Sequence, residues 1–368
     1  MSGPLGVLVT VALFIIVLGS LVLVHELGHF LTARFAGVRV LEFGIGFPPR
    51  AKVLRSHGET LYTLNWLPIG GFVRLEGEDG DDSGDPRSFV RASVPTKLII
   101  LVAGVLTNLV VAFLIFTVIA WLATPFVGLR FFEVQPGSPA AAAGLQSGDA
   151  ILAIDGRQSE FFGDSSILTD LRSKVGQTVT LTVERPSGEV VPVTVALRPA
   201  DQVDDAHGPL GIVGDQTPFE ARFFGTYSRD LPSAIAVGAQ QTVHWFGVIL
   251  AGLGSLVGQV ASNPTAPPPV AGPVGIATQI SDVFFNGGPI LTLYVAGILS
   301  ANLALVNSLP FPPLDGGRML MILLKAVFGS RISVRAERLT YVVGFAFLFA
   351  FLIWVSGFDI VRILSGGT

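Results

Sequence analysis

The stretch LGSLVLVHELGHFLTARFAG, residues 18–37, places His25, Glu26 and His29 at the end of a long apolar run. Residues 5–24 contain no charged side chain, and a helix of that length, at ~1.5 Å per residue, spans a hydrocarbon core of ~30 Å. Helix-compatible sequence continues to about residue 36. The run has neither the basic start nor the cleavage site of a signal peptide. We therefore predict a retained membrane-spanning helix with three ionisable groups near one end.

The composition of the whole chain agrees with a membrane protein. Of its 368 residues, 50% are hydrophobic and 14% are charged, and the mean hydropathy is +0.65, whereas soluble domains have roughly 25% charged residues. The net charge of −4 offers no general attraction to nucleic acid, so we expect no nucleic-acid partner. Because the chain has no cysteine, catalysis must use other side chains or a metal held by nitrogen and oxygen ligands.

Three further segments have the length and composition of spanning helices: residues 98–121, 289–309 and 339–358. A fifth apolar stretch, residues 234–260, is interrupted by Gln240, Gln241 and His244 and is predicted to lie at the membrane interface. The predicted fold is therefore a polytopic α-helical membrane protein with four transmembrane helices and an inserted extracytoplasmic β-rich domain.

The distribution of Lys and Arg predicts the orientation. Basic residues gather in residues 34–97 and 318–338, so both loops should be cytoplasmic and residues 123–286 should lie outside. The end of the first helix that holds His25 and His29 then faces the cytoplasmic side. The acidic tract EGEDGDDSGD, residues 76–85, is predicted to be a solvated flexible linker.

The inserted segment shows period-two alternation on both sides of Ser187-Gly188, which predicts a β-hairpin. Upstream of it, PGSPAAAAGLQSGDAILAIDG, residues 136–156, resembles a bacterial PDZ domain. That resemblance implies binding of a peptide or protein by strand addition to a sheet edge. A domain that only gates access, without a ligand, is the alternative.

The spacing of His25 and His29 puts both imidazoles on one helical face, with Glu26 beside them. This pattern is typical of a zinc site in which the glutamate is a general base. A catalytic zinc usually has a third protein ligand, and Asp315 in ANLALVNSLPFPPLDGGRM, residues 301–319, is the best candidate. The prolines should end the preceding helix, and Gly316-Gly317 should allow a tight turn. A helix N-cap is the alternative role for Asp315.

These motifs, in this order, resemble the site-2 protease family of intramembrane zinc metalloproteases, peptidase family M50, and more closely its bacterial RseP-like branch. The resemblance implies a Zn²⁺ cofactor held by His25, His29 and Asp315, with Glu26 as the catalytic base. It also implies substrate-binding positions in NSLPFPPLDGG and its preceding helix, and in LPIGGFVRL, part of a membrane-associated hairpin at about residues 60–75. These positions are Asn302, Asn307, Gly70, Gly71, Phe72 and Val73.

Two features differ from the family pattern. The motif in the second helix usually has a proline where this chain has Val105, which leaves the local course of that helix open. The chain also has room for a single PDZ domain where well-known relatives have two. Substrate gating is therefore expected to differ.

The predicted organisation has four parts. Residues 1–124 hold helices one and two, residues 125–210 the PDZ domain, residues 211–288 a linker with the interfacial helix, and residues 289–368 helices three and four. The predicted activity is cleavage of single-pass membrane proteins within the bacterial inner membrane, in contact with membrane lipid. Anti-sigma factors and signal-peptide remnants are the substrates that the resemblance suggests.

Two other functions are compatible with parts of the sequence. One is a non-catalytic PDZ scaffold with a structural metal, although a structural zinc has no use for Glu26. The other is a zinc transporter, which should have several metal sites along a path. The remaining predicted helices offer almost no ligands, and His57 and His207 are expected in exposed polar roles.

Overall fold

The computed structural model describes residues 4–56, 58–78, 84–163, 166–204, 207–213, 222–263, 265–329 and 333–365. The chain forms two compact units. One combines Met1–Phe116 with Gly238–Thr368, and the other is Thr117–Val237. The described part of the first unit holds the helices of the chain's two ends and a β-hairpin.

Long helices dominate the first unit: α1 (Pro4–Phe35), α2 (Val94–Leu122), α5 (Leu231–Ser262), α6 (Pro273–Ser308), α7 (Asp315–Phe328) and α8 (Val334–Leu364). All except α7 are long and apolar enough to cross a membrane. Three of the four predicted spans fall within one of these helices, and the span predicted at residues 289–309 ends one residue beyond α6. Large apolar side chains such as Leu8 and Val343 are exposed along them, as expected of surfaces that face lipid rather than water.

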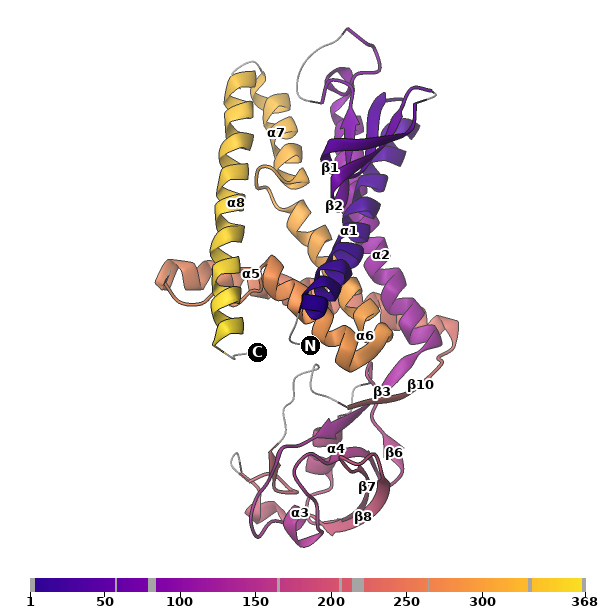
Figure 1. Cartoon of the computed structure of the whole chain (residues 1–368), viewed down its shortest axis with the longest axis vertical. Helices are drawn as coiled ribbons and strands as arrows, with labels where there is room; N and C mark the ends of the chain where they lie inside the picture. Colours follow the sequence, from indigo (N-terminus) through magenta and orange to yellow (C-terminus); the bar gives the residue numbers. More distant parts are fainter. Residues whose placement is uncertain are drawn as a thin grey trace. The chain divides into compact units, whose positions relative to one another are not determined.

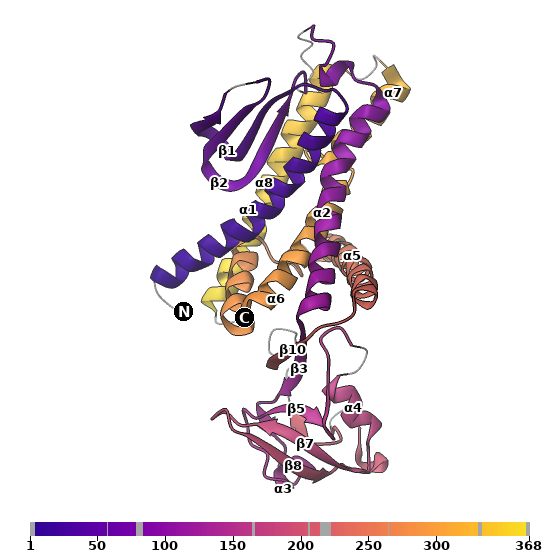
Figure 2. The same cartoon turned by 90° about the vertical axis from the view of Figure 1, so that its right-hand side faces the viewer.

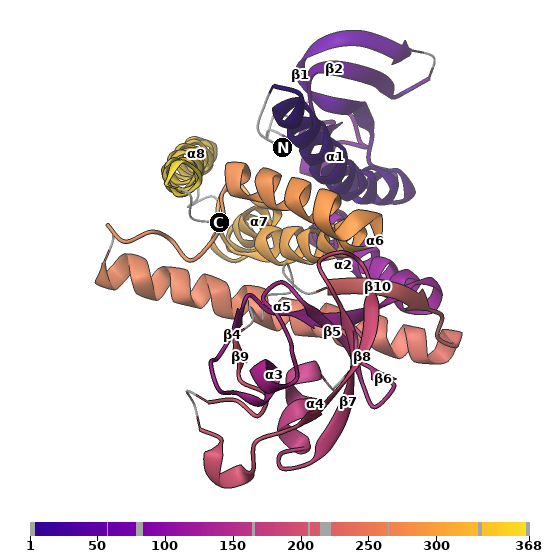
Figure 3. The ribbon, with the colours of Figure 1, turned by 60° about the horizontal axis from the view of Figure 1, so that its bottom comes forward.

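Helix α5 meets the same criteria of length and composition as the four predicted spans. Figure 1 shows it running across the direction of α8 rather than along it. Its interfacial placement remains a prediction. Seen from below, α6 and α7 lie between α8 and α1 (Figure 3).

Helix α6 consists of two helical parts joined at a kink. Gly288 has φ 74 and ψ −174, which is not helical, and Pro289 follows it. A residue with positive φ is tolerated best when it is glycine, and proline is well suited to the first position of a new helix. The second part therefore begins where the sequence predicts the third span to begin.

The predicted hairpin consists of β1 (Val40–Arg55) and β2 (Leu61–Leu75). It lies against α1 on the side away from α2 (Figure 2). Residues 42–45 of β1 have partners both in residues 61–64 and in residues 71–74 of β2. The final segment of β2, residues 71–75, therefore forms one edge of this small sheet in the described part of the chain.

A buried apolar cluster anchors that edge beside α1. Phe30 of α1, Val40 of β1, Leu75 of β2 and Ile100 of α2 belong to this cluster. Gly70 and Gly71 bring the strand still closer, because a Cβ on Gly70 would lie 2.6 Å from Val22 and one on Gly71 would lie 2.8 Å from Leu23. The sequence of β2 thus fixes it against the helix that holds the two histidines.

The second unit is β-rich. Its main sheet has the strand order β10 (Arg222–Tyr227), β3 (Thr124–Arg130), β5 (Ala150–Ile154), β7 (Thr178–Glu184) and β8 (Val190–Ala196), with β6 (Arg157–Gln158) paired to β5. β4 (Glu133–Val134) pairs with β9 (Ile212–Val213), and the short helices are α3 (Pro139–Ala142) and α4 (Ile167–Ser173). The predicted hairpin is confirmed, because β7 and β8 pair throughout and Gly188 has φ +86 in the turn between them.

Candidate metal centre

Helix α1 places its two histidines one above the other. Both are buried, with 6% of His25 and 7% of His29 exposed, and their Nε2 atoms lie 3.2 Å apart. The helical repeat of 3.6 residues puts positions four apart on the same face. The two imidazoles thus converge on one point.

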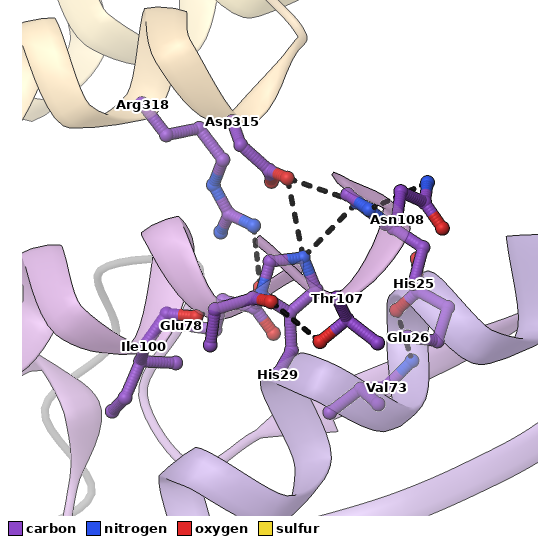
Figure 4. A network of polar contacts seen from close by, with 11 residues as sticks. His25, Glu26, His29, Val73, Glu78, Ile100, Thr107, Asn108, Asp315 and Arg318 are labelled. Carbon is purple, nitrogen blue, oxygen red and sulfur yellow. Dashed lines mark hydrogen bonds and ion pairs between the residues drawn. The ribbon is translucent and has the colours of Figure 1, made fainter. Parts of the chain in front are cut away.

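Asp315 reaches the same point from the far end of the chain. Its Oδ2 lies 3.0 Å from Nε2 of His25 and 3.2 Å from Nε2 of His29 (Figure 4). Asp315 is the first residue of α7, and the N-cap position belongs to Leu314. The alternative role of Asp315 as an N-cap is therefore wrong.

Gly316 and Gly317 serve a purpose other than the predicted tight turn. Neither has a positive φ, and both lie within α7. A Cβ on Gly316 would lie 2.2 Å from the Leu309 carbonyl oxygen, and one on Gly317 would lie 2.6 Å from Phe311. The two glycines let α7 begin directly against the loop that ends α6, which brings Asp315 to the histidines.

The three converging atoms fit a shared cation. His29 Nδ1 is 2.8 Å from the Ile100 carbonyl oxygen, so Nδ1 is the donor and Nε2 of the neutral ring carries a lone pair. With neutral imidazoles, Asp315 Oδ2 is a buried oxygen without a donor in the described part of the chain. A tetrahedral zinc with bonds of ~2.0–2.1 Å requires ligand atoms about 3.3 Å apart, close to the separations observed here. His25, His29 and Asp315 are also the one such group of metal-binding side chains in the described residues.

Asn108 of α2 contacts the imidazole of His25, a role that the sequence did not predict. Its Nδ2 lies 3.4 Å from His25 Nδ1, and its Oδ1 is buried without a partner in the described part of the chain. Oxygen and nitrogen of an amide are assigned rather than observed. Turning this amide by 180° gives Oδ1 a donor in His25 Nδ1–H, which leaves Nε2 of His25 free to bind a metal.

Gly104 of α2 provides the space that the imidazoles occupy. A Cβ at this position would lie 2.3 Å from His29 Nε2 and 2.9 Å from His25 Cε1. Gly28 of α1 allows the matching approach, since its Cβ would lie 2.4 Å from Thr107 Oγ1. Such small residues let membrane helices pack closely.

Helix α2 continues through Val105, so the missing proline does not end or begin the helix there.

Glu26 lies beside the metal-binding group and contacts the hairpin. The backbone N–H of Val73 donates to its Oε2 at 3.1 Å (Figure 4). In the described part of the chain, this half-buried carboxylate accepts no second hydrogen bond. One oxygen of Glu26 is thus held by β2.

The remaining predicted site residues are placed separately. Gly70, Gly71 and Phe72 lie on β2 next to Val73. Asn302 and Asn307 lie on α6, half-buried, and no hydrogen bond in the described part links either amide to the three converging side chains. His207 contacts Asp204 in the second unit, the ring of His244 meets that of Trp245 edge to face, and His57 lies outside the described residues.

This arrangement is typical of a hydrolytic metal centre. It combines two histidines one turn apart on an apolar helix, a glutamate between them and an aspartate from a distant segment. The chain belongs to peptidase family M50, whose model matches residues 13–351. It is 29% identical to "Zinc metalloprotease RasP" of Geobacillus kaustophilus, over 94% of this chain and 96% of that protein. It is also 29% identical to "Zinc metalloprotease RasP" of Oceanobacillus iheyensis, over 96% and 99% of the two chains. It is 26% identical to "Probable protease eep" of Enterococcus faecalis, again over 96% and 99%.

Proposed function

We propose that this protein is a zinc peptidase that hydrolyses peptide bonds of transmembrane segments within the membrane. The main support is the convergence of three ligand atoms within 3.0–3.2 Å of one another. Two of them belong to α1, a helix long enough to span a bilayer, and the third belongs to Asp315 of α7. Membership of peptidase family M50 and the zinc metalloproteases among its relatives agree with this proposal.

The proposed chemistry divides between the metal and the protein. His25, His29 and Asp315 would hold a zinc ion, which would supply the Lewis acidity that polarises a scissile carbonyl and lowers the pKa of a water. Glu26 accepts the proton of the attacking water and delivers it to the leaving amine. The Val73 N–H, at 3.1 Å from Glu26 Oε2, orients this carboxylate for both transfers.

A helical substrate must unwind before its peptide bonds can be attacked, and each exposed backbone group in lipid costs several kcal/mol unless it finds a partner. The edge segment of β2, residues 71–75, has partners in β1 on one side only. An extended substrate segment can therefore add to this edge beside Glu26. We propose that the amides of Asn302 and Asn307 bind further backbone groups of the same segment.

The β-rich unit, Thr117–Val237, is proposed to be a single PDZ domain outside the cytoplasm. It would bind a peptide or protein by strand addition, or would gate access sterically. The proposed location is the bacterial inner membrane, with the metal centre toward the cytoplasmic side because Lys and Arg gather in the two predicted cytoplasmic loops. Single-pass proteins such as anti-sigma factors or signal-peptide remnants are the proposed substrates.

The test compares wild type with Glu26→Gln in cells that lack the chromosomal copy. Glu26→Gln should retain zinc in the purified protein, measured by elemental analysis, while single-pass fragments accumulate in the membrane proteome. Glu59→Gln is a matched control because Glu59 is an exposed partner of Arg87 in the same unit. Normal fragment levels in the Glu26→Gln cells would contradict the proposed mechanism. Absence of zinc from the wild-type protein would contradict the metal assignment.

A non-catalytic scaffold with a structural metal predicts instead that Glu26→Gln has no effect on any membrane protein. A zinc transporter predicts further ligand groups along a path, and the described residues contain the single group His25, His29 and Asp315. The same proteome comparison therefore separates the proposed peptidase from the scaffold.

A further inference from the structure

The acidic tract that follows β2 contacts α7, the helix of Asp315, through one of its residues. Glu78 is only 17% exposed at its side chain, and its Oε1 accepts a hydrogen bond from Arg318 Nη1 at 2.6 Å. Its Oε2 accepts the backbone N–H of Leu75 at 3.0 Å. Both carboxylate oxygens are therefore occupied, and Glu78 is not part of a solvated linker as the composition of the tract predicts. Residues 79–83 of the tract lie outside the described residues.

Arg318 lies on the first turn of α7, three residues after Asp315. Side chains three apart on a helix are neighbours, so a contact that fixes Arg318 also fixes the turn that presents Asp315. Burial alone would lower the pKa of Arg318, but the charge of Glu78 and its hydrogen bond raise it above the ordinary value. Arg318 therefore stays charged, as a guanidinium does in proteins.

Helix α7 has few other directional contacts with its surroundings. Its N-cap, Leu314, makes no side-chain hydrogen bond. Apart from the contacts of Asp315 with His25 and His29, α7 has two ion pairs in the described part of the chain. One joins Lys325 to Glu337 of α8, and the other joins Arg318 to Glu78 beside β2. Besides Asp315 itself, the Glu78–Arg318 pair is therefore the ion pair that joins α7 to the side of the unit where the histidines lie.

The same end of β2 also contacts the general base. Val73 donates its N–H to Glu26, and Leu75, which anchors Glu78, is buried with 5% exposure in the cluster beside α1. Figure 4 shows Glu26, Val73, Glu78 and Arg318 around the converging ligands. One short segment, residues 73–78, thus contacts α1 directly and α7 through Arg318.

We propose that Glu78 and Arg318 are positioning residues whose ion pair holds the first turn of α7 so that Asp315 completes the metal site. This inference rests on the proposed zinc function. It assigns a role to Glu78 of the acidic tract. The end of β2, which is also the proposed substrate-binding strand, would then hold both Glu26 and, through Arg318, Asp315.

The test measures zinc affinity rather than activity. Full-length Glu78→Gln, Arg318→Gln, the double variant and Arg318→Lys are purified in nanodiscs, and Zn²⁺ is titrated against a chromophoric chelator. Positioning predicts that both single Gln variants weaken zinc binding by about 10–100-fold. The double variant should be no weaker than the weaker single variant, because the pair acts as a unit. Arg318→Lys, which keeps the charge and one donor, should recover most of the affinity.

Simple charge effects predict a different pattern. Removing the negative charge of Glu78 would weaken zinc binding, whereas removing the positive charge of Arg318 would strengthen it. An increase in affinity for Arg318→Gln would therefore overturn the positioning role, as would additive losses in the double variant. Glu59→Gln removes the same charge from an ion pair with Arg87 and should bind zinc like wild type.

Two outcomes separate this inference from the proposed function. If wild type binds zinc tightly and all four variants bind it equally well, the positioning role fails and the peptidase assignment stands. If wild type binds no zinc, the proposed function itself fails. Thermal unfolding of the zinc-free proteins shows whether each variant is folded, and if Arg318→Gln does not fold, Glu78→Gln and Arg318→Lys still decide between the outcomes.

Discussion

Substitution of Gly104 by alanine tests the geometry of the metal centre most directly. The new methyl group would lie 2.3 Å from His29 Nε2 and 2.4 Å from His29 Cε1. Non-bonded carbon atoms prefer ~3.5–4.0 Å, so the imidazole or the helix must move by roughly 1 Å. Overpacking of this kind destabilises proteins by about 1–3 kcal/mol, partly offset by the ~1 kcal/mol that alanine gains over glycine inside a helix.

The functional loss should exceed the loss of stability. A displacement of about 1 Å in a catalytic group can lower the rate by ~10²-fold, and displaced ligands should weaken zinc binding by about tenfold or more. Zinc affinity is measured by chelator competition. Cleavage is measured on a single-pass protein found to accumulate in Glu26→Gln cells.

Gly254→Ala of α5 is the matched control for this substitution. A Cβ there meets nothing within 4 Å, so it adds the same helix propensity without a clash and should leave zinc binding and cleavage unchanged. If Gly104→Ala binds zinc and cleaves like wild type, α2 does not pack against the imidazoles as described, and the reasoning is refuted.

Three further substitutions separate the roles of groups around the metal. Asn108→Ala should weaken zinc binding by about 10–100-fold. Asn108→Asp keeps an acceptor for His25 Nδ1–H and should bind zinc nearly as well as wild type. Equal losses in the two variants would contradict the orientation in which Asn108 Oδ1 accepts from His25. Val73→Pro removes the N–H that binds Glu26 and should lower kcat about 10–100-fold, the value of a hydrogen bond to a charged group, with zinc retained; Val73→Ala keeps the N–H and should be near normal. Asn307→Ala should slow cleavage while sparing zinc, and loss of zinc in that variant would indicate a structural role.

The sequence predicted the parts of the site that have a fixed spacing or a distinctive context. His25 and His29 are one helical turn apart on an apolar run, so their convergence follows from helix geometry alone. Asp315 could be named because the predicted orientation puts it on the same side of the membrane as the histidines, and because the prolines before it should end the preceding helix. The long apolar helices follow from composition, since only uninterrupted apolar stretches suit lipid.

Contacts between distant segments could not be predicted in this way. Glu78 is one acidic residue among several in its tract, and nothing in the tract distinguishes the residue that meets Arg318. Gly316 and Gly317 were expected to allow a turn, but they relieve crowding against Leu309 and Phe311. The composition of a segment predicts how well it is solvated on average. The roles of Glu78, Gly316 and Gly317 depend instead on which distant segment packs against each residue.

Gly104 shows how one missing side chain can serve two requirements at once. In an α-helix, the carbonyl of residue i points toward residue i+4, whose side chain flanks it. The carbonyl of Ile100 is thus flanked by position 104, and it is this carbonyl that accepts His29 Nδ1–H at 2.8 Å. Glycine at 104 therefore leaves room for the imidazole edge and also exposes the acceptor that fixes its tautomer. A larger residue would remove both, so the position is constrained by the chemistry of His29 and not only by the packing of two helices.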